Sequence, residues 1–410
     1  LGGTSYEPMG LQNNDHTIVE SGKILNIQGF GVQDERQLTG MIIAKPGSVV
    51  IIKNVHIKES DLHDNIVNDP NKQNDPDFAH FFLKKGILVL GGGSDSANEK
   101  TFSSANGQFD VLDKNGNLLD LKYGFGENPL IIFENLKITK YGEDLDVNAV
   151  TFYQTNTVNN LSVYNTGTTQ TTTYSSNIDT LEIVSSKEDG IEVNGGDLDL
   201  SNITINSSVN EYFILKNGYS GSVNNINFIV PSSQDSKLLT LGSEDSSDTT
   251  TTGTISGVTV DVVDTSVSFD NSDIIYSINS NYTGTIPDVT FKSNVNFQLT
   301  SGNEYELFSS VTFEGVVNCD GATIKKGTGA NSTACNVTLK GNNKTFTNMT
   351  LNSCGALILD TLDSTNTISN FTNTSSPTTG LEISGGTVNV STININSATD
   401  EYWVLSSHSG

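Results

Sequence analysis

The sequence predicts an all-β chain folded as a parallel β-solenoid, in which short strands stack rung upon rung. Three observations favour this fold class. One long segment recurs at a fixed offset, strand-like segments recur at near-regular spacing, and helical periodicity is almost absent from residues 151–410. The alternative fold is a tandem array of β-sandwiches, which also shows short strands separated by turn signals.

The first observation is a repeat of residues 190–220 at 380–410. Residues 190–215 read GIEVNGGDLDLSNITINSSVNEYFIL, and residues 380–405 read GLEISGGTVNVSTININSATDEYWVL, without a gap between the two copies. Glycine, apolar and polar positions all coincide. Such self-similarity indicates a duplication or one recurring structural unit.

The second observation is a shorter rhythm inside and around the repeat. Segments such as LSNITINS, VNNINFIV and FTNMTLNS place an Asn ahead of alternating apolar residues, and most start roughly 20–25 residues apart. Stacked rungs align equivalent side chains, so recurring Asn would form hydrogen-bonded ladders and recurring Ile or Val apolar stacks. Sandwich strands have no reason to repeat one pattern, which favours the solenoid.

These rung-like segments carry a family resemblance. GSVVIIKNVHIKES, LDLSNITINSS and NVSTININSA resemble rungs of the right-handed parallel β-helix (pectin-lyase-like) superfamily, and within it the adhesin-like surface proteins. The resemblance covers most of the chain as a pattern, without a family-specific motif. It implies a right-handed parallel β-helix.

Residues 1–150 are expected to form a distinct N-terminal part of the β-helix, since 13 of the 21 basic residues lie there and 151–410 is rich in Ser, Thr and Asn. Two insertions are predicted in it: an acidic loop at 59–80 and a β-hairpin at 107–122. The hairpin would turn at Asn115-Gly116 with a type I′ turn. A calcium loop, suggested by the spacing of Asp113, Asn115 and Asn117, lacks the glycine and the glutamate at the required offsets.

Net charge and composition limit the classes of partner that are expected. The formal net charge is −26, only 17% of residues are charged, and Arg36 is the single arginine. An acidic surface repels phosphate backbones and anionic lipid, so nucleic acid and membrane surfaces are not expected as partners. No apolar run is long enough to span a membrane. Scarce lysine, an acidic surface and abundant Ser, Thr and Asn predict an extracellular or cell-surface location.

Several side chains are candidates for metal binding, disulfide formation or modification. Asp61, Asp64 and Asp69 in the acidic loop are weak metal candidates without a liganding spacing; a structural calcium ion is the one cofactor considered. Cys319, Cys335 and Cys354 allow one disulfide with a free thiol, or three thiols. Covalent N-glycans are possible at eleven N-x-S/T sequons, a number that chance alone explains: Asn160, Asn202, Asn206, Asn281, Asn331, Asn336, Asn343, Asn348, Asn370, Asn373 and Asn389.

No active site is predicted. Polygalacturonase-like enzymes of the resembled superfamily carry paired aspartates, an Asn-Thr-Asp segment and a Gly-His-Gly, and none of these occurs in the chain. Pectate-lyase-like enzymes use an arginine base, and Arg36 lies near the N-terminus. The aromatic residues Tyr212, Phe213, Tyr402 and Trp403 could stack on sugars, or could fill the same apolar corner in both copies of the repeat.

The expected function is therefore structural. After residue 220 the first copy of the repeat continues into another rung, whereas the second copy stops at 410. An uncapped rung could be covered by another copy of the chain, and head-to-tail stacking that does not close produces a filament. The leading hypothesis is an extracellular glycoprotein subunit of a surface filament. The alternatives are a cell-surface adhesin stalk that binds carbohydrate, and a polysaccharide lyase or glycoside hydrolase.

Overall fold

The computed structural model describes residues 16–38, 40–59, 84–139, 148–165, 168–186, 188–208, 210–231, 237–243, 245, 248–263, 276–292, 304–307, 309–314, 317–320, 323–326, 336–340, 344–352, 355–362, 367–376, 379–386, 389–398 and 403–406. The chain divides into two compact units. Unit 1 comprises Leu1–Ser222 with Ser247–Gly253, and unit 2 comprises Val223–Ser246 with Thr254–Gly410. Each unit is described by itself.

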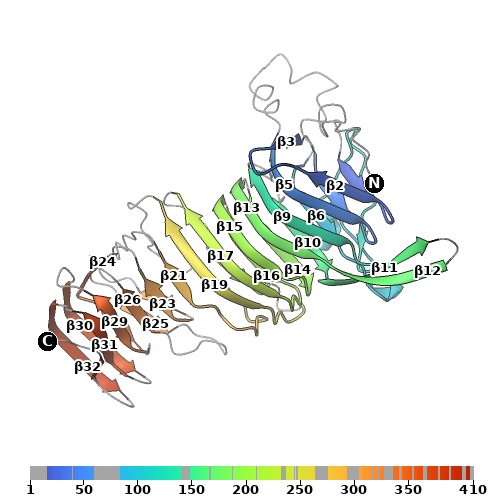
Figure 1. The fold of residues 1–410 in the computed structure, drawn as a ribbon. Coiled ribbons are helices and arrows are strands. Elements are labelled where there is room, and N and C mark those ends of the chain that lie inside the picture. The colour runs from blue at the N-terminus through green and yellow to red at the C-terminus, as the bar shows by residue number, and fades with distance from the viewer. Residues whose placement is uncertain are drawn as a thin grey trace. The chain divides into compact units, whose positions relative to one another are not determined.

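Unit 1 is built from two parallel sheets, whose strands lie side by side in Figure 1. Sheet A contains, in spatial order, β1 (Thr17–Val19), β4 (Ile42–Ala44), β6 (Ile87–Leu90), β10 (Val150–Thr155), β14 (Ile191–Gly196) and β16 (Glu211–Lys216). Sheet B contains β2 (Ile24–Gln28), β5 (Val49–Glu59), β9 (Leu130–Thr139), β13 (Asn177–Ser186) and β15 (Leu200–Ser208), and β3 (Glu35–Leu38) pairs with the second half of β5.

The chain alternates between these sheets, so that each circuit adds one strand to sheet A and one to sheet B. All the pairs within the two sheets are parallel. This confirms the all-β parallel solenoid. The tandem-sandwich alternative is wrong, because immunoglobulin-like sandwiches are built from antiparallel strands.

Apolar side chains of equivalent positions stack between the sheets of unit 1. One column of sheet B runs through Ile57, Ile138, Ile183 and Ile205, which face one another in register and are fully buried. One column of sheet A runs through Val89, Phe152, Val193 and Leu215, equally buried. Each such side chain contributes on the order of 1.5–3 kcal/mol through burial. The predicted apolar stacks are therefore present.

A second column consists of residues with a left-handed backbone, one in each long strand of sheet B, and each of them bends its strand. Asn54, Asn135, Thr180 and Asn202 stand opposite one another in register, and all have φ between 50° and 57°. Non-glycine residues rarely adopt this left-handed conformation, and Asn tolerates it best. We call these positions the kink column. The side-chain amide of Asn135 donates to Oδ1 of Asn54 at 3.0 Å, so the predicted asparagine ladder is formed here.

Within the described residues, two insertions leave the sheets of unit 1; the acidic loop predicted at 59–80 lies outside them except for Glu59. The hairpin of β11 (Val158–Asn165) and β12 (Thr168–Ser175) is antiparallel and extends away from sheets A and B in Figure 1. Residues 91–129, which we call the insertion, link β6 to β9. They contain two short 3-10 turns, Ser96–Asn98 and Ser104–Asn106, and an antiparallel pair formed by β7 (Lys100–Thr101) and β8 (Lys122–Tyr123).

The tip of the insertion is an antiparallel turn at 111–119, with Leu112 opposite Leu118. Its turn is not type I′. The Gly116 amide donates to the Asp113 carbonyl, and of Asn115-Gly116 only Gly116 has positive φ, at 81°. The loop therefore holds three residues that end in a left-handed glycine. The Asp113 carboxylate accepts from the amides of Asn115 and Asn117, so it closes the turn.

Unit 2 is also parallel. One run of neighbouring strands is β17 (Ser222–Val230), β19 (Thr254–Val262), β21 (Val289–Phe291), β23 (Val311–Phe313), β26 (Val337–Lys340), β29 (Leu357–Leu362), β31 (Leu381–Gly386) and β33 (Trp403–Ser406). A second sheet contains β22 (Glu304–Leu307), β25 (Thr323–Lys326), β28 (Thr350–Asn352), β30 (Thr367–Ser376), β27 (Lys344–Thr347), β24 (Val317–Asp320) and β32 (Asn389–Ala398). β18 (Lys237–Leu241) pairs with β20 (Tyr276–Ile278).

The kink column recurs in unit 2. Asn348, Asn370 and Thr392 have φ between 50° and 53°, and the Asn370 amide donates to Oδ1 of Asn348 at 2.9 Å. The two copies of the sequence repeat also share their strands: β14, β15 and β16 in the first copy, and β31, β32 and β33 in the second. Thr392 in the second copy occupies the position of Asn202 in the first. The repeat is therefore a strand–kinked strand–strand unit that spans more than one circuit, because its first and last strands are neighbours in the same sheet.

Candidate functional site

The insertion packs against the outer face of sheet A. Ile43, Leu88 and Leu90 point outward from β4 and β6 and are fully buried beneath insertion residues. Phe102 makes edge contacts with Phe109 and with Tyr153 of β10, each with ring centroids 5.0 Å apart. The sheet face is apolar at these strands because the insertion covers it, and this packing holds the segment 107–109 beside β10.

Three consecutive glycines, Gly91–Gly93, allow the chain to pass very close to neighbouring backbone where it leaves β6. A Cβ on Gly91 would lie 1.9 Å from the carbonyl oxygen of Gln154, and one on Gly92 would lie 2.1 Å from that of Gly126. Gly93 and Gly126 exchange two backbone hydrogen bonds of 2.9 and 3.0 Å. A side chain at Gly91 or Gly92 would push the insertion off the sheet.

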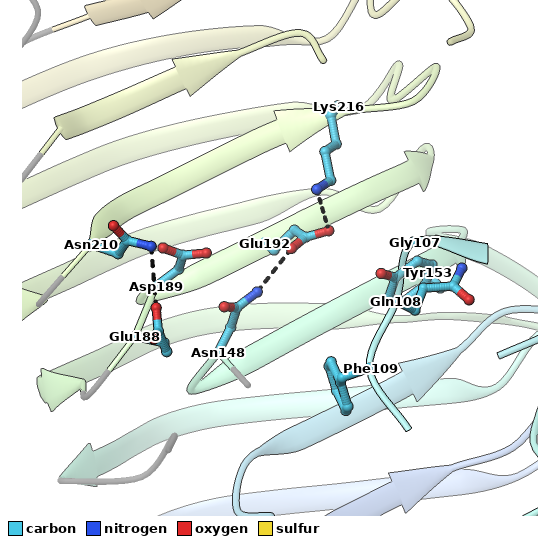
Figure 2. Close-up of a pocket in the computed structure, with 10 residues that line it drawn as sticks. All are labelled: Gly107, Gln108, Phe109, Asn148, Tyr153, Glu188, Asp189, Glu192, Asn210 and Lys216. Atoms are coloured by element: carbon cyan, nitrogen blue, oxygen red, sulfur yellow. Dashed lines mark hydrogen bonds and ion pairs between the residues drawn. The ribbon is translucent and has the colours of Figure 1, made fainter. Parts of the chain in front are cut away.

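Next to the insertion, the outer face of sheet A is polar and hollowed by a pocket of about 340 Å³ (Figure 2). This is the lower end of the range typical of ligand sites. The lining residues come from the insertion, from the segments before β10, β14 and β16, and from the strands themselves: Gly107, Gln108, Phe109, Asn148, Tyr153, Glu188, Asp189, Glu192, Asn210 and Lys216.

Glu192 lies between the two ends of the pocket. It is on β14, its residue is 6% exposed, and its carboxylate accepts from three donors. Asn148 Nδ2 lies 2.9 Å from Oε2, Asn194 Nδ2 lies 3.2 Å from Oε1, and Lys216 Nζ lies 3.0 Å from Oε1. A buried carboxylate is tolerated only with such partners. Burial lowers the pKa of Lys216, but the attraction of Glu192 outweighs it and the net shift is upward.

One end of the pocket is acidic. Figure 2 shows Glu188, Asp189 and Asn210 gathered there, with Asn210 Nδ2 donating to Oε2 of Glu188 at 3.2 Å. Oδ1 of Asp189 accepts from the Glu211 amide at 2.9 Å. Burial, with help from the charges of Glu211, Glu192 and Glu188, raises the pKa of Asp189 to about 7.

Asn148 adds an open acceptor to this end. The residue is 5% exposed and its amide nitrogen is held by Glu192. Within the part of the chain that the structure describes, its carbonyl oxygen accepts no hydrogen bond. Asn148 nevertheless lines the pocket. This oxygen is not among the described side-chain atoms that are buried without a partner, so it is accessible from the pocket, where water or a ligand can donate to it.

The sequence did not point to this pocket. Tyr212 and Phe213, the proposed sugar-stacking residues, are buried in the core at 1% and 0% exposure and do not line it. A signal was available in the two copies of the repeat. Lys216 is replaced by Ser406 in the second copy, and Glu188 and Asp189, which directly precede the first copy, correspond to Thr378 and Thr379 before the second. The second copy forms the same strands without those three side chains, so the rung does not require them.

The predicted metal site lies outside the described residues, since Asp61, Asp64 and Asp69 fall in 60–83. Among described residues no group of His, Cys, Asp and Glu is arranged to hold a metal ion. Cys335 and Cys354 also lie outside the described residues, and only the backbone of Cys319 is described. In the same ranges no helix is long and apolar enough to cross a membrane.

The structure removes two sequons from the set of glycan candidates. Asn373 is fully buried, and its Nδ2 donates to the carbonyls of Gly355 and Gly380. Asn281 is 8% exposed, and its Oδ1 accepts from the Ser243 amide. A glycan is bulky and needs a surface position.

The other nine sequons divide by exposure. Asn202, Asn348 and Asn370 are exposed members of the kink column, and Asn206 and Asn336 are half-buried. Only the backbone is described for Asn160 and Asn389, and Asn331 and Asn343 lie outside the described residues.

Comparison with known proteins adds little. No protein-family model matches the chain, and no curated protein matches it. Among solved structures the chain is similar to the Streptococcus pneumoniae surface protein and adhesin PfbA. The match has 8% sequence identity and a TM-score of 0.26 over 93% of this chain and 91% of that chain. A likeness at that TM-score carries no argument, and the fold rests on the parallel strand pairing.

Proposed function

We propose that the chain is an extracellular carbohydrate-binding protein of the adhesin type, which holds a sugar in the pocket on the outer face of sheet A. The observation that carries this proposal is the lining of the pocket. Amide, carboxylate and ammonium groups converge on it, and two of them, Asn148 and Glu192, are almost fully buried. Sugar hydroxyls both donate and accept, so they suit such a mixed lining.

The duplicated rung supports the proposal. Lys216 of the first copy, and Glu188 and Asp189 directly before it, have no counterpart in or directly before the second copy, which still forms its strands. Side chains that a rung does not need, gathered around one cavity, are better explained by binding than by folding. The solenoid then acts as a rigid support, and the insertion supplies one wall of the site through Gly107, Gln108 and Phe109.

The test is a screen of the labelled chain against immobilised glycans, with two lysine variants as the comparison. Lys216→Met removes the cation beside Glu192. Lys53→Met removes the cation of another ion pair, Lys53–Glu134 at 2.8 Å, whose glutamate is more exposed and which lies on sheet B away from the pocket. The two lysine side chains are similarly exposed, at 29% and 27%. We expect glycan binding in the unmodified chain and in Lys53→Met, and its loss in Lys216→Met.

Other functions predict other outcomes. If no glycan is bound, or if both lysine variants bind equally, the proposal is wrong. Release of shortened sugars from a bound oligosaccharide would instead favour the enzymatic alternative, with Asp189 and Glu192 as the carboxyl pair. Ordered filaments of dilute protein in the electron microscope would favour the filament alternative.

A further inference from the structure

We propose that the pocket is specific for an amino sugar, a hexosamine residue with a free, protonated amine, which binds at the acidic end beside Asn148 and Asp189. This inference rests on the proposed carbohydrate-binding function and narrows it to one class of sugar. It depends on which hydrogen-bonding atoms the pocket leaves open, and on how charge is distributed along it.

The open atoms at the acidic end are acceptors. The carbonyl oxygen of Asn148 has no donor among the residues that the structure describes. Asp189 uses Oδ1 to accept from the Glu211 amide, and its other oxygen accepts from no described residue. Two neighbouring acceptors, one of them on a nearly buried side chain, call for a ligand group that carries several donors. An ammonium group has three N–H donors and no acceptor.

Charge at this end also favours a cation. Glu188, Asp189 and Glu192 line the pocket, and Glu211 donates its backbone amide to Asp189. Among the described lining residues Lys216 is the one cation, and it is already paired with Glu192 at 3.0 Å. The upward shift of the Asp189 pKa agrees with this, since it comes from burial and from the charges of Glu211, Glu192 and Glu188. An ammonium group would supply that charge.

The charge of the pocket lining changes along the strand direction, from Lys216 at one end to the acidic residues at the other. Lys216 pairs in register with Asn194, two residues beyond Glu192 on β14, whereas Asn148 and Asp189 precede their strands. Figure 2 shows Glu192 between Lys216 and the acidic end. A bound sugar can therefore direct its amine toward Asp189 and its hydroxyl or ring oxygens toward Lys216. A sugar acid lacks the ammonium donors that the acidic end calls for and adds a negative charge to a lining with three carboxylates, which disfavours that class.

The test compares three trimers with the same β-1,4-linked glucose backbone and different groups at C2. They are the glucosamine trimer, the N-acetylglucosamine trimer and cellotriose, measured by calorimetry with the full chain at low salt and pH 7 rather than below it, because the Asp189 carboxyl has a pKa of about 7 and must be ionised to accept from the amine. We expect the glucosamine trimer to bind about tenfold or more tightly than the other two, the ratio given by about 1.4 kcal/mol. Added salt should reduce that preference, because it screens the charge interaction.

Two aspartate variants locate the amine. Asp189→Asn keeps an oxygen for the Glu211 amide but removes the charge. Asp179→Asn is the control, because Asp179 accepts from Ser201 and Asn202 on sheet B in the same unit. We expect Asp189→Asn to abolish most of the glucosamine preference and Asp179→Asn to preserve it. The trimer series on the unmodified chain tests the inference even if Asp189→Asn does not fold.

The failures are distinguishable. If the three trimers bind equally, or the acetylated trimer binds most tightly, the amino-sugar inference is wrong and carbohydrate binding stands. If methylamine competes as well as the glucosamine trimer does, the site recognises cations rather than amino sugars, and the inference is again wrong. If no trimer and no arrayed glycan binds, both the inference and the proposed function fail.

Discussion

Asn135 donates its side-chain amide to Oδ1 of Asn54 at 3.0 Å, and both residues hold a left-handed backbone with φ of 50° and 53°. The two residues are 81 positions apart in the sequence and stand directly opposite in strands β5 and β9. One side chain thus performs two tasks. It tolerates the kink of its own strand, and it bonds the strand to the preceding rung.

Substitution at Asn135 separates these two tasks. Asn135→Gly keeps the conformation but loses the hydrogen bond, and we expect it to lower the free energy of unfolding by about 1 kcal/mol. Asn135→Ala loses the hydrogen bond and also places alanine in a strained left-handed conformation. We therefore expect it to lower the free energy of unfolding by about 2–3 kcal/mol. Urea denaturation measures both. Equal effects of the two variants would contradict a role for backbone strain.

Substitution of Gly196 and of Gly22 by alanine separates the free-energy cost of a backbone clash from the cost of a left-handed backbone. Both have positive φ, 82° and 73°, but a Cβ on Gly196 would lie 2.1 Å from the Thr155 carbonyl oxygen, whereas one on Gly22 meets nothing within 4 Å. We expect Gly22→Ala to cost about 1 kcal/mol, from strain alone. Gly196→Ala should cost roughly 2–5 kcal/mol, because a backbone clash adds to the strain. Thermal unfolding of the two variants compares them directly.

Asp189 makes stability depend on pH. Its pKa is about 7 in the folded chain and 3.8 for a free side chain, so folding favours the protonated form. The stability that Asp189 contributes is complete below pH 3.8 and is lost as pH rises through 7. Asp189→Asn does not titrate. It should match the parent at pH 4 and exceed it at pH 8, by at most about 4 kcal/mol. A constant difference across this range would contradict the raised pKa.

Phe102 anchors the insertion to sheet A. Phe102→Ala removes a fully buried ring that contacts Phe109 and Tyr153, a change that typically costs about 3–5 kcal/mol. We expect the loss to be local, because the sheets have their own apolar core. Limited proteolysis should show faster cleavage within 91–129, together with weaker glycan binding, while circular dichroism retains the β signal. Unfolding of the whole of unit 1 would contradict a local effect.

The fold was predictable because its determinants repeat. Val, Ile and Leu recur at alternate positions next to an Asn, and in stacked rungs each such position meets its equivalent, so Ile57, Ile138, Ile183 and Ile205 align without long-range information. The turn at Asn115-Gly116 was less predictable. An Asn-Gly pair fits more than one hairpin loop, and the hydrogen bonds of Asp113 select the three-residue form.

The pocket was not predictable, because it depends on an interaction that does not repeat. Glu192, Asn148 and Lys216 come from three different rungs, and their approach depends on the register between strands. The wall formed by Gly107–Phe109 depends on how an insertion of irregular structure packs. Alternation of apolar and polar residues specifies which face is outward but not which outward side chains meet.

The kink column has a consequence for how such a chain can change in length over evolution. Neighbouring rungs contain different numbers of residues: 81 separate Asn54 from Asn135, 45 separate Asn135 from Thr180, and 22 separate Thr180 from Asn202. Yet the four positions remain aligned. Gains and losses of sequence are therefore confined to the segments between strands, and a whole rung can be copied in one event provided that its kink residue is Asn, Thr or Gly. A genetic duplication then lengthens the protein by a step of about 4.8 Å per rung, and a side chain such as Lys216 can be acquired on one copy while the other, with Ser406, keeps only what the rung needs.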